Sequence, residues 1–130
     1  MIQRNTFSKK ERLCSKKAIE NLFKKGRSGF VFPLKYIYNL EQLPIGGVEI
    51  LITIPKRSFK RAVHRNHLKR LIREAYRQQK HRLTEVALEK NLKLQIAFIF
   101  VHKEKTDFQQ IYISVGKILH QISKQITSLE

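Results

Sequence analysis

The chain has 130 residues, a formal net charge of +17 and 42% hydrophobic residues. This length suits one domain with a single core, and the hydrophobic fraction argues against wholesale disorder. Cys14 is the only cysteine, which excludes an intrachain disulfide and a thiolate metal cluster. The longest apolar run, Ile96 to Val101, is too short to cross a bilayer, and the N-terminal residues lack the apolar run of a secretory signal. The sequence therefore predicts a single domain over residues 1–130, located in the cytoplasm.

Positive charge is concentrated in two segments of the chain. Residues 1–30 hold nine basic and two acidic side chains, residues 56–82 hold eleven and one, and the rest of the chain holds seven of each. Ordinary soluble surfaces mix charges of both signs, so this segregation favours a polyanionic partner over simple solvation. We expect the fold to set the two basic segments side by side, where they would form one strongly positive surface.

The N-terminal part of the chain predicts a basic arm followed by a short helix. Residues 1–10 are polar and basic, which favours a loosely ordered arm. Ser15 is a suitable N-cap and Gly26 a suitable C-cap for a helix between them. Ile19 and Phe23 share one side of this helix, where they either pack in the core or line an open groove beside cations.

Two strands follow, over residues 30–32 and 34–39, because Pro33 interrupts a run of aromatic and branched residues. The alternation of the second strand places Tyr36 and Tyr38 on one face. These tyrosines are either core residues with their hydroxyls at the rim or a platform for stacking, and the sequence favours neither alternative.

A further strand over Val48–Ile54 leads through Pro55 into the basic segment. Residues 58–82 contain neither Pro nor Gly and predict a long amphipathic helix, with Ser58 as a possible N-cap. At about 100° per residue, one arc of this helix is apolar and would enter the core. The members of the apolar arc are Leu68, Leu71, Ile72 and Ala75. The opposite arc presents cations and one amide, namely Arg65, Asn66, Lys69, Arg70, Arg73 and Arg77.

The C-terminal part predicts one more strand and one more long helix. Residues 81–91 have helical apolar spacing and either extend the basic helix or form a separate turn. Leu92–Val101 becomes apolar on both faces, which is typical of a central strand, and Thr106-Asp107-Phe108-Gln109 resembles a capping box that opens a final helix. These elements predict an α+β fold with helices packed on a four-stranded sheet, in the order helix, strands, basic helix, strand, helix. The strand–helix–strand unit around the basic helix predicts a parallel crossover.

The order of polar residues in the basic helix resembles a known signature. The run Arg65-Asn66-His67-Leu68-Lys69-Arg70-Leu71-Ile72-Arg73 is similar to the signature helix of the bacterial ribonuclease P protein subunit, in which Arg-Asn-Arg is followed by a Lys-Arg pair and a further Arg. His67 stands where that family usually has its second Arg, and Pro55-Lys56-Arg57 stands where Ser-Lys-Lys is commoner. The resemblance implies a left-handed βαβ crossover and a ribosomal S5 domain 2-like fold. It also implies that the chain binds two RNA molecules, the catalytic ribonuclease P RNA and precursor tRNA. The catalytic RNA, with Mg²⁺, removes the 5′ leader of the precursor tRNA.

The resemblance assigns residues of this chain to two surfaces. A cleft between the first helix and the sheet would hold the leader and would be lined by Ile19, Phe23 and Tyr36. Mg²⁺ is expected mainly on the RNA partner, with no metal site and no catalytic residue in this chain. The RNA-facing residues come from the basic helix and the approach to it, and they are Lys56, Arg57, Lys60, Arg61, Arg65, Asn66, His67, Lys69, Arg70 and Arg73.

Charge alone is also compatible with other functions. A ribosomal or ribosome-associated RNA-binding protein or RNA chaperone could use a similar fold. A self-contained endonuclease would need a general base, a nucleophile or a metal site, and the ten carboxylates and five histidines show no such grouping. His64 and His67 could form a metal or acid–base pair or could serve RNA hydrogen bonding, and Asn66 could contact RNA or cap the helix start. We therefore expect a protein that binds RNA while another molecule carries the chemistry.

Overall fold

A computed structural model of the chain describes residues 12–13, 15–42, 46–104 and 106–127. The basic arm expected over residues 1–10 lies outside the described residues. In chain order the elements are α1 (Lys16–Lys25), β1 (Arg27–Val31), β2 (Leu34–Gln42), β3 (Gly47–Thr53), α2 (Ala62–Gln79), α3 (His81–Glu89), β4 (Leu92–Phe100) and α4 (Phe108–Thr127).

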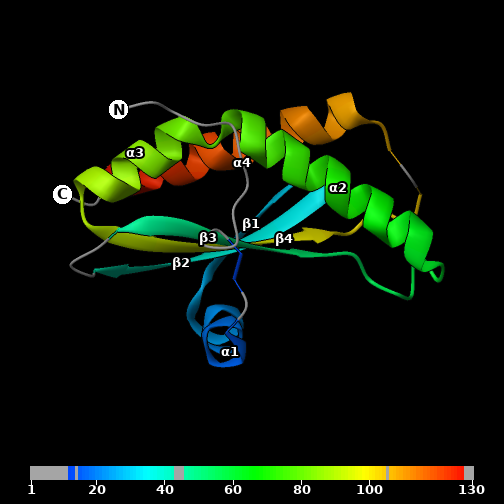
Figure 1. Ribbon diagram of the computed structural model, residues 1–130, viewed down its shortest axis with the longest axis horizontal. Coiled ribbons are helices and arrows are strands. Elements are labelled where there is room, and N and C mark those ends of the chain that lie inside the picture. The colour runs from blue at the N-terminus through cyan, green and yellow to red at the C-terminus, as the bar shows by residue number, and fades with distance from the viewer. Residues whose placement is uncertain (1–11, 14, 43–45, 105, 128–130) are drawn as a thin grey trace.

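The strands form one four-stranded sheet, with α1 on one face and α2, α3 and α4 on the other (Figure 1). The strand order is β1-β2-β4-β3. β2 pairs antiparallel with both β1 and β4, whereas β3 and β4 pair in parallel. Because α2 and α3 connect the parallel pair, the predicted α+β sheet and the predicted parallel crossover are both confirmed. None of the helices within the described ranges has both the length and the apolar character needed to span a bilayer.

The main core lies between the sheet and the three helices above it. Tyr76 of α2 packs against Phe98 of β4 with their ring centroids 6.3 Å apart, and both side chains are fully buried. The last helix, α4, contributes an apolar stripe to this core. The buried hydrophobic members of that stripe are Ile111, Val115, Ile118, Leu119, Ile122 and Ile126.

Tyr36 and Tyr38 belong to this core and do not form a stacking platform. Their exposed fractions are 4% and 3%. The hydroxyl of Tyr36 donates to Oε1 of Gln121 at 2.8 Å, and that of Tyr38 donates to Oε1 of Gln125. Since α4 covers both rings and accepts a hydrogen bond from each hydroxyl, neither tyrosine presents a face to a ligand.

Helix α1 packs on the opposite face of the sheet through a second, smaller core. The side-chain oxygen of Ser15 accepts from the N–H of Ala18 at 3.3 Å, and the N–H of Gly26 donates to the carbonyl of Leu22 at 2.8 Å. Both predicted caps are therefore confirmed. The buried residues of the smaller core are Leu13, Leu22, Ile37 and Ala97.

The basic helix is shorter than its sequence pattern predicts. Helix α2 follows Arg61 as its N-cap, and no side chain caps it. The proposed cap, Ser58, lies instead in a turn in which its N–H donates to the carbonyl of Pro55 at 3.2 Å. At the other end Lys80 separates α2 from α3, so the segment that follows is a helix of its own.

The start of α4 is shifted by one residue from the predicted capping box. Oδ1 of Asp107 accepts from the N–H of Gln110 at 2.9 Å, which makes Asp107 the capping residue. Thr106 bonds through its hydroxyl to the side chain of Gln110. The predicted helix is thus present, but Thr106 supports the cap and does not form it.

Candidate nucleic-acid interface

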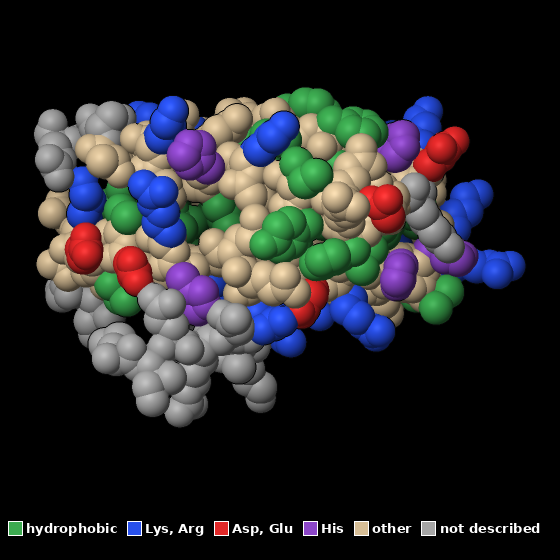
Figure 2. Space-filling view, turned by 90° about the horizontal axis from the view of Figure 1, so that it is seen from above, with side chains coloured by type: hydrophobic (Ala, Val, Ile, Leu, Met, Phe, Trp, Pro, Cys, Tyr) green, Lys and Arg blue, Asp and Glu red, His purple; other side chains and the backbone are tan. Residues whose placement is uncertain are grey.

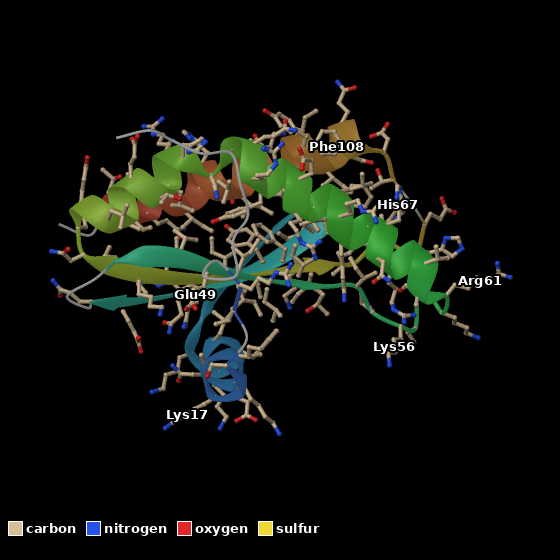
Figure 3. All side chains as sticks on the ribbon, viewed as in Figure 1. Lys17, Glu49, Lys56, Arg61, His67 and Phe108 are labelled. Carbon is tan, nitrogen blue, oxygen red and sulfur yellow. The ribbon has the colours of Figure 1, made fainter. Side chains whose placement is uncertain are left out.

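Helix α2 buries one arc, as its sequence pattern predicts, and leaves the opposite arc exposed or half-buried. Leu68 and Ile72 are fully buried, which fixes the orientation of the helix on the sheet. Lys56, Arg61 and His67 project from the end of the molecule where α2 begins (Figure 3). The exposed members of the predicted RNA-facing set are Lys56, Arg57, Lys60, Arg61, Asn66, His67 and Arg70. This end of the molecule therefore offers a cluster of accessible cations.

Arg65 points partly back into the protein. Its Nη1 donates to the carbonyl of Phe59 at 2.7 Å and to the carbonyl of Lys60 at 2.8 Å. Both carbonyls belong to the turn that precedes α2, and no side chain caps that helix. The guanidinium therefore braces the turn, a structural role that the position of Arg65 in the motif did not reveal.

The start of α2 excludes one of the two roles considered for Asn66. Because the helix begins at Ala62, Asn66 lies in its second turn and cannot be its cap. Its exposed amide can both donate and accept hydrogen bonds. His67 is exposed and His64 is half-buried, and across the described ranges no three His, Cys, Asp or Glu side chains gather in a way that could hold a metal ion.

A cationic hollow lies where α2 meets the edge strand β3. Arg12, Lys69 and Arg73 line it together with apolar residues of β3, and its volume is about 160 Å³. The N–H of Leu13 donates to a carbonyl of β3 at 2.8 Å, which lays Arg12 along the edge of the sheet. Burial lowers the pKa of Arg73, and the nearby charges of Arg12 and Arg70 lower it further. Like charges held this close favour an anion between them, so Arg12 joins the candidate interface although the sequence reasoning missed it.

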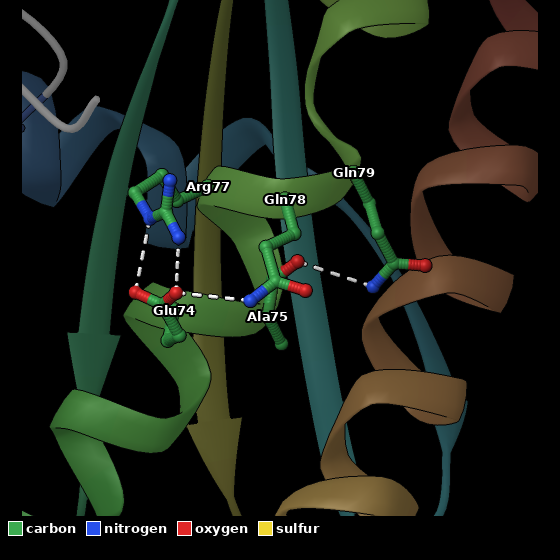
Figure 4. Close-up of polar contacts among 5 residues, drawn as sticks. All are labelled: Glu74, Ala75, Arg77, Gln78 and Gln79. Atoms are coloured by element: carbon green, nitrogen blue, oxygen red, sulfur yellow. Dashed lines mark hydrogen bonds and ion pairs between the residues drawn. The ribbon is translucent and has the colours of Figure 1, made fainter. Parts of the chain in front are cut away.

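The single acid of the basic helix is engaged within the helix (Figure 4). Nε of Arg77 donates to Oε2 of Glu74 at 2.9 Å, and Nη2 of Arg77 and Nε2 of Gln78 donate to Oε1 of the same carboxylate. The hydrogen bonds from Arg77 and then Gln78 lower the pKa of Glu74 to about 2. A carboxylate with so low a pKa is a very weak general base. Arg77 is correspondingly engaged by Glu74, so we do not count its guanidinium among the cations of the candidate interface.

Helices α1 and α2, from the two basic segments, do not lie side by side, contrary to the expectation from their charge, although Arg12 of the first segment reaches α2. Helix α1 lies on one side of the sheet with Lys17 pointing away from it, and α2 lies on the other side (Figures 1 and 3). The reason is that each helix buries its apolar arc against a different face, in separate cores. From above, the helical layer shows Lys and Arg interspersed with hydrophobic, acidic and His side chains (Figure 2). The candidate interface therefore follows one end of α2 and the β3 edge, and does not cover the whole helical layer.

The sheet face that carries α1 is covered only in part. Strand pairing sets the residues of this face in rows that cross all four strands. Helix α1 packs on the row made of Ser28, Ile37, Ala97 and Leu51. The next row, called here the open row, is made of Phe30, Lys35, Ile99 and Thr53. Phe30 and Lys35 are exposed and the other two are half-buried, so this row forms an accessible floor beside α1.

The two flanks of α1 face different parts of this sheet surface. One flank and the sheet enclose a polar hollow of about 530 Å³, lined among others by Lys17, Asn21, Lys24, Glu41 and Gln95. Gln95 lies on the side of α1 away from the open row. Helical spacing therefore places Ile19 and Phe23 on the flank that faces the open row. Ile19 packs partly against the smaller core, whereas Phe23 is 46% exposed, so the pair combines the two roles considered for it.

Tyr36 does not lie on the side of the sheet that carries α1. Its ring lies over Gly29 on the helical face of the sheet, where Gln121 of α4 accepts a hydrogen bond from its hydroxyl. The prediction that Tyr36 lines a cleft with Ile19 and Phe23 is wrong, because successive residues of a strand point to opposite faces. The β2 residue on the α1 side is the next one along the chain, Ile37, which is 8% exposed.

These features define a basic α+β protein that presents cations on a crossover helix and leaves half of one sheet face open, an arrangement suited to a polyanion. The family model for Ribonuclease P matches residues 7–123, and the chain belongs to that family. The ribonuclease P protein component of Porphyromonas gingivalis is 37% identical over 122 residues, covering 93% of this chain and 89% of the relative. That of Chlorobium phaeobacteroides is 30% identical over 129 residues, covering 91% and 88%.

Solved structures share the fold at lower sequence identity. The RNase P protein of Staphylococcus aureus matches with a TM-score of 0.69 and 23% identity, covering 88% of this chain and 95% of that chain. The RNase P protein of Thermotoga maritima matches with a TM-score of 0.66 and 23% identity, covering 85% and 96%. The α+β architecture predicted from the sequence is thus confirmed as that of RNase P proteins.

Proposed function

We propose that this chain is the protein subunit of ribonuclease P and that it binds both the catalytic RNA and the 5′ leader of precursor tRNA. The observation that carries the proposal is the surface formed by α2 and the basic residues just before it, called here the α2 surface. There, polar residues in an order typical of the family lie along a helix whose other arc is fixed in the core. Asn66, His67 and Arg70 are exposed, and Arg65, Lys69 and Arg73 are half-buried. Through both contacts the protein assists removal of the leader, which gives the mature 5′ end of the tRNA.

The α2 surface suits a structured RNA. Arg70 and the exposed cations before α2 can meet phosphates, with Arg binding two oxygens at once and Lys acting as a mobile point charge. The amide of Asn66 can reach a 2′-hydroxyl or a base edge, which is how proteins recognise RNA helices by shape and backbone. The hollow of Arg12, Lys69 and Arg73 extends this surface around the β3 edge. We assign the catalytic RNA to this surface.

The floor beside α1 suits a single strand. Single-stranded nucleic acids bind where aromatic rings for stacking alternate with cations for phosphates. Phe23 supplies an exposed ring on the wall of the cleft, and Lys35 supplies a cation on its floor. Glu41 and Glu49 lie away from the open row, on the other side of the row that α1 covers. We therefore assign the leader to the flank of α1 that carries Ile19 and Phe23.

The chain acts in this proposal by binding and by neutralising charge. Two RNA molecules that approach one another repel through their phosphates, and a protein with a net charge of +17 lowers that repulsion. Hydrolysis is assigned to the RNA with Mg²⁺ bound mainly by that RNA. We assign no reaction step to a metal ion bound by the protein, because the side chains in its described part provide no cluster of ligands. Since precursor tRNA is the substrate, the proposed location is the cytoplasm.

The test combines purified protein, ribonuclease P RNA and precursor tRNA at low Mg²⁺. The protein should accelerate leader removal, and Arg70→Gln should weaken its binding to the RNA. Lys124→Gln is the matched control, because it removes one exposed positive charge from α4 instead of α2. Leader removal that is no faster with the protein than without it would refute the proposal. Cleavage by the protein alone would point instead to a self-contained endonuclease.

A further inference from the structure

Phe30 is an exposed aromatic residue at the edge of the sheet. It lies on β1, the strand at the opposite edge from β3, and 58% of its surface is exposed. Its partner across the strand pair is Lys35, which is also exposed. Residues directly opposite one another on antiparallel strands have their Cβ atoms about 4.5–5.5 Å apart. The strand register therefore sets an accessible ring beside an accessible ammonium group.

This pair does not contribute to either core. The neighbouring residue Val31 packs against the main core on the helical face, so Phe30 points to the α1 side of the sheet. The smaller core on that side reaches the open row at Ile99 of β4, two strands away from Phe30. A single exposed apolar side chain is common on protein surfaces, so it is the cation beside Phe30 and the open row next to it that make this ring a candidate for binding.

The surroundings of the ring favour a nucleotide over a folded protein. Protein interfaces have a desolvated, apolar core that is depleted in charged residues. Phe30 instead has Lys35 directly beside it, and the open row continues with Ile99 and Thr53. A base can stack on an aromatic ring while the phosphate next to it meets a cation, which is how single strands are held without sequence readout.

We propose that Phe30 and Lys35 form a distal nucleotide subsite for the 5′ leader. The cations of the α2 surface reach the sheet at β3, whereas Phe30 lies on β1, three strand spacings or about 14 Å away. A strand that runs from the β3 edge along the open row reaches Phe30 only after crossing the whole sheet. The subsite therefore distinguishes leaders by length: a long leader occupies it, and a short leader does not. This inference rests on the proposed binding of the leader beside α1.

The experiment measures the affinity of the assembled holoenzyme for precursor tRNAs that carry a series of leader lengths. With the wild-type protein, affinity should rise at the length that reaches β1. Phe30→Ala should remove that gain, a loss of roughly five- to tenfold, which is the low end of what one stacked base contributes. Phe30→Tyr should keep the gain because it keeps the ring. Lys35→Gln should reduce the salt dependence of binding for long leaders only.

Phe32→Ala is the matched control for loss of an exposed ring. Phe32 is 47% exposed but lies in the turn after β1, outside the open row, with its ring 4.9 Å from that of His102. With the Phe32→Ala protein, affinity should depend on leader length as it does with the wild type. Both Phe variants should unfold at the wild-type temperature. A Phe30→Ala protein that keeps the gain, or that loses affinity equally for short and long leaders, overturns the distal subsite while leaving the proposed function intact. A wild-type protein that neither binds the RNA nor accelerates cleavage removes the proposed function, and the subsite with it.

Discussion

Arg65 should support stability as well as RNA binding, unlike Arg70 one turn further along α2. The perturbation is Arg65→Ala, which removes two hydrogen bonds from Nη1, at 2.7 Å to the carbonyl of Phe59 and at 2.8 Å to that of Lys60. The turn that these bonds brace is tied to the core, because the ring of Phe59 packs 5.7 Å from that of Phe100. Losing them therefore loosens the entry to the whole helix.

The expected magnitude follows from the two bonds. Hydrogen bonds to a charged group contribute about 1.5–3 kcal/mol each when well shielded from water. The bond to Lys60 is exposed and the guanidinium is half-buried, so solvent compensates for much of the loss. We expect about 1–2 kcal/mol for the pair, which for a domain of this size lowers the Tm by about 3–8 °C. Arg70→Ala removes an exposed side chain and should change stability by less than about 0.5 kcal/mol.

The assay compares thermal and urea unfolding of the two variants in one buffer, together with their affinity for ribonuclease P RNA. Both variants lose one positive charge from the same helix, so relief of charge repulsion is common to both and the difference isolates the two bonds. Both should bind RNA more weakly, and only Arg65→Ala should also unfold earlier. Equal unfolding midpoints for the two variants would refute the bracing role of Arg65.

Three further predictions follow from the same structure. RNA affinity should fall by about three decades between about 50 and 200 mM salt if about six phosphates are engaged. Arg70→Gln should reduce the slope of log affinity against log salt concentration by about one, and a salt-insensitive affinity would contradict the electrostatic account. The pKa of Glu74 is lowered from 4.5 to about 2, so its contribution to stability is present above pH 4.5 and is lost as the pH falls toward 2. Urea midpoints of the wild type and Glu74→Gln should therefore differ at pH 7 and converge near pH 2, whereas a difference that persists at pH 2 would have another cause. Gly29→Ala should destabilise the protein by about 1–3 kcal/mol, because its Cβ would lie 2.4 Å from the ring of Tyr36, and an unchanged Tm would show that the ring can move aside.

The apolar faces of the helices and the positions of the strands could be predicted because burial follows the spacing of apolar residues along the chain. Leu68 and Ile72 are spaced so that one helical face is apolar, and the structure buries both completely. The start of α2 could not be predicted in the same way. Nothing in local propensity prevents a helix from Ser58, and the turn found there is braced by a side chain six residues beyond Phe59. The bond from Arg65 exists only once the turn has folded.

The face assigned to Tyr36 shows a second limit of sequence reasoning. Tyr36 and Ile37 are both buried, so alternation along β2 separates two faces without showing which of them meets α1. The choice depends on Gly29, whose missing side chain leaves room for the tyrosine ring across the strand pair. The exposure of Asn66, His67 and Arg70 on α2 was easier to predict, since exposure on a helix follows directly from the position of its buried arc. Their contact with RNA stays a prediction.

The two basic segments meet at the edge of the sheet although their helices lie apart. Helices α1 and α2 lie on opposite faces of the sheet, and β3 is the strand at the edge between them. Arg12, from the first segment, runs along that edge and meets Lys69 and Arg73, from the second, in one hollow. Thr53 begins the open row on the other face of the same strand. A phosphate chain that passes from the α2 surface to the open row must round this edge, so the hollow joins the surface proposed for the catalytic RNA to the one proposed for the leader.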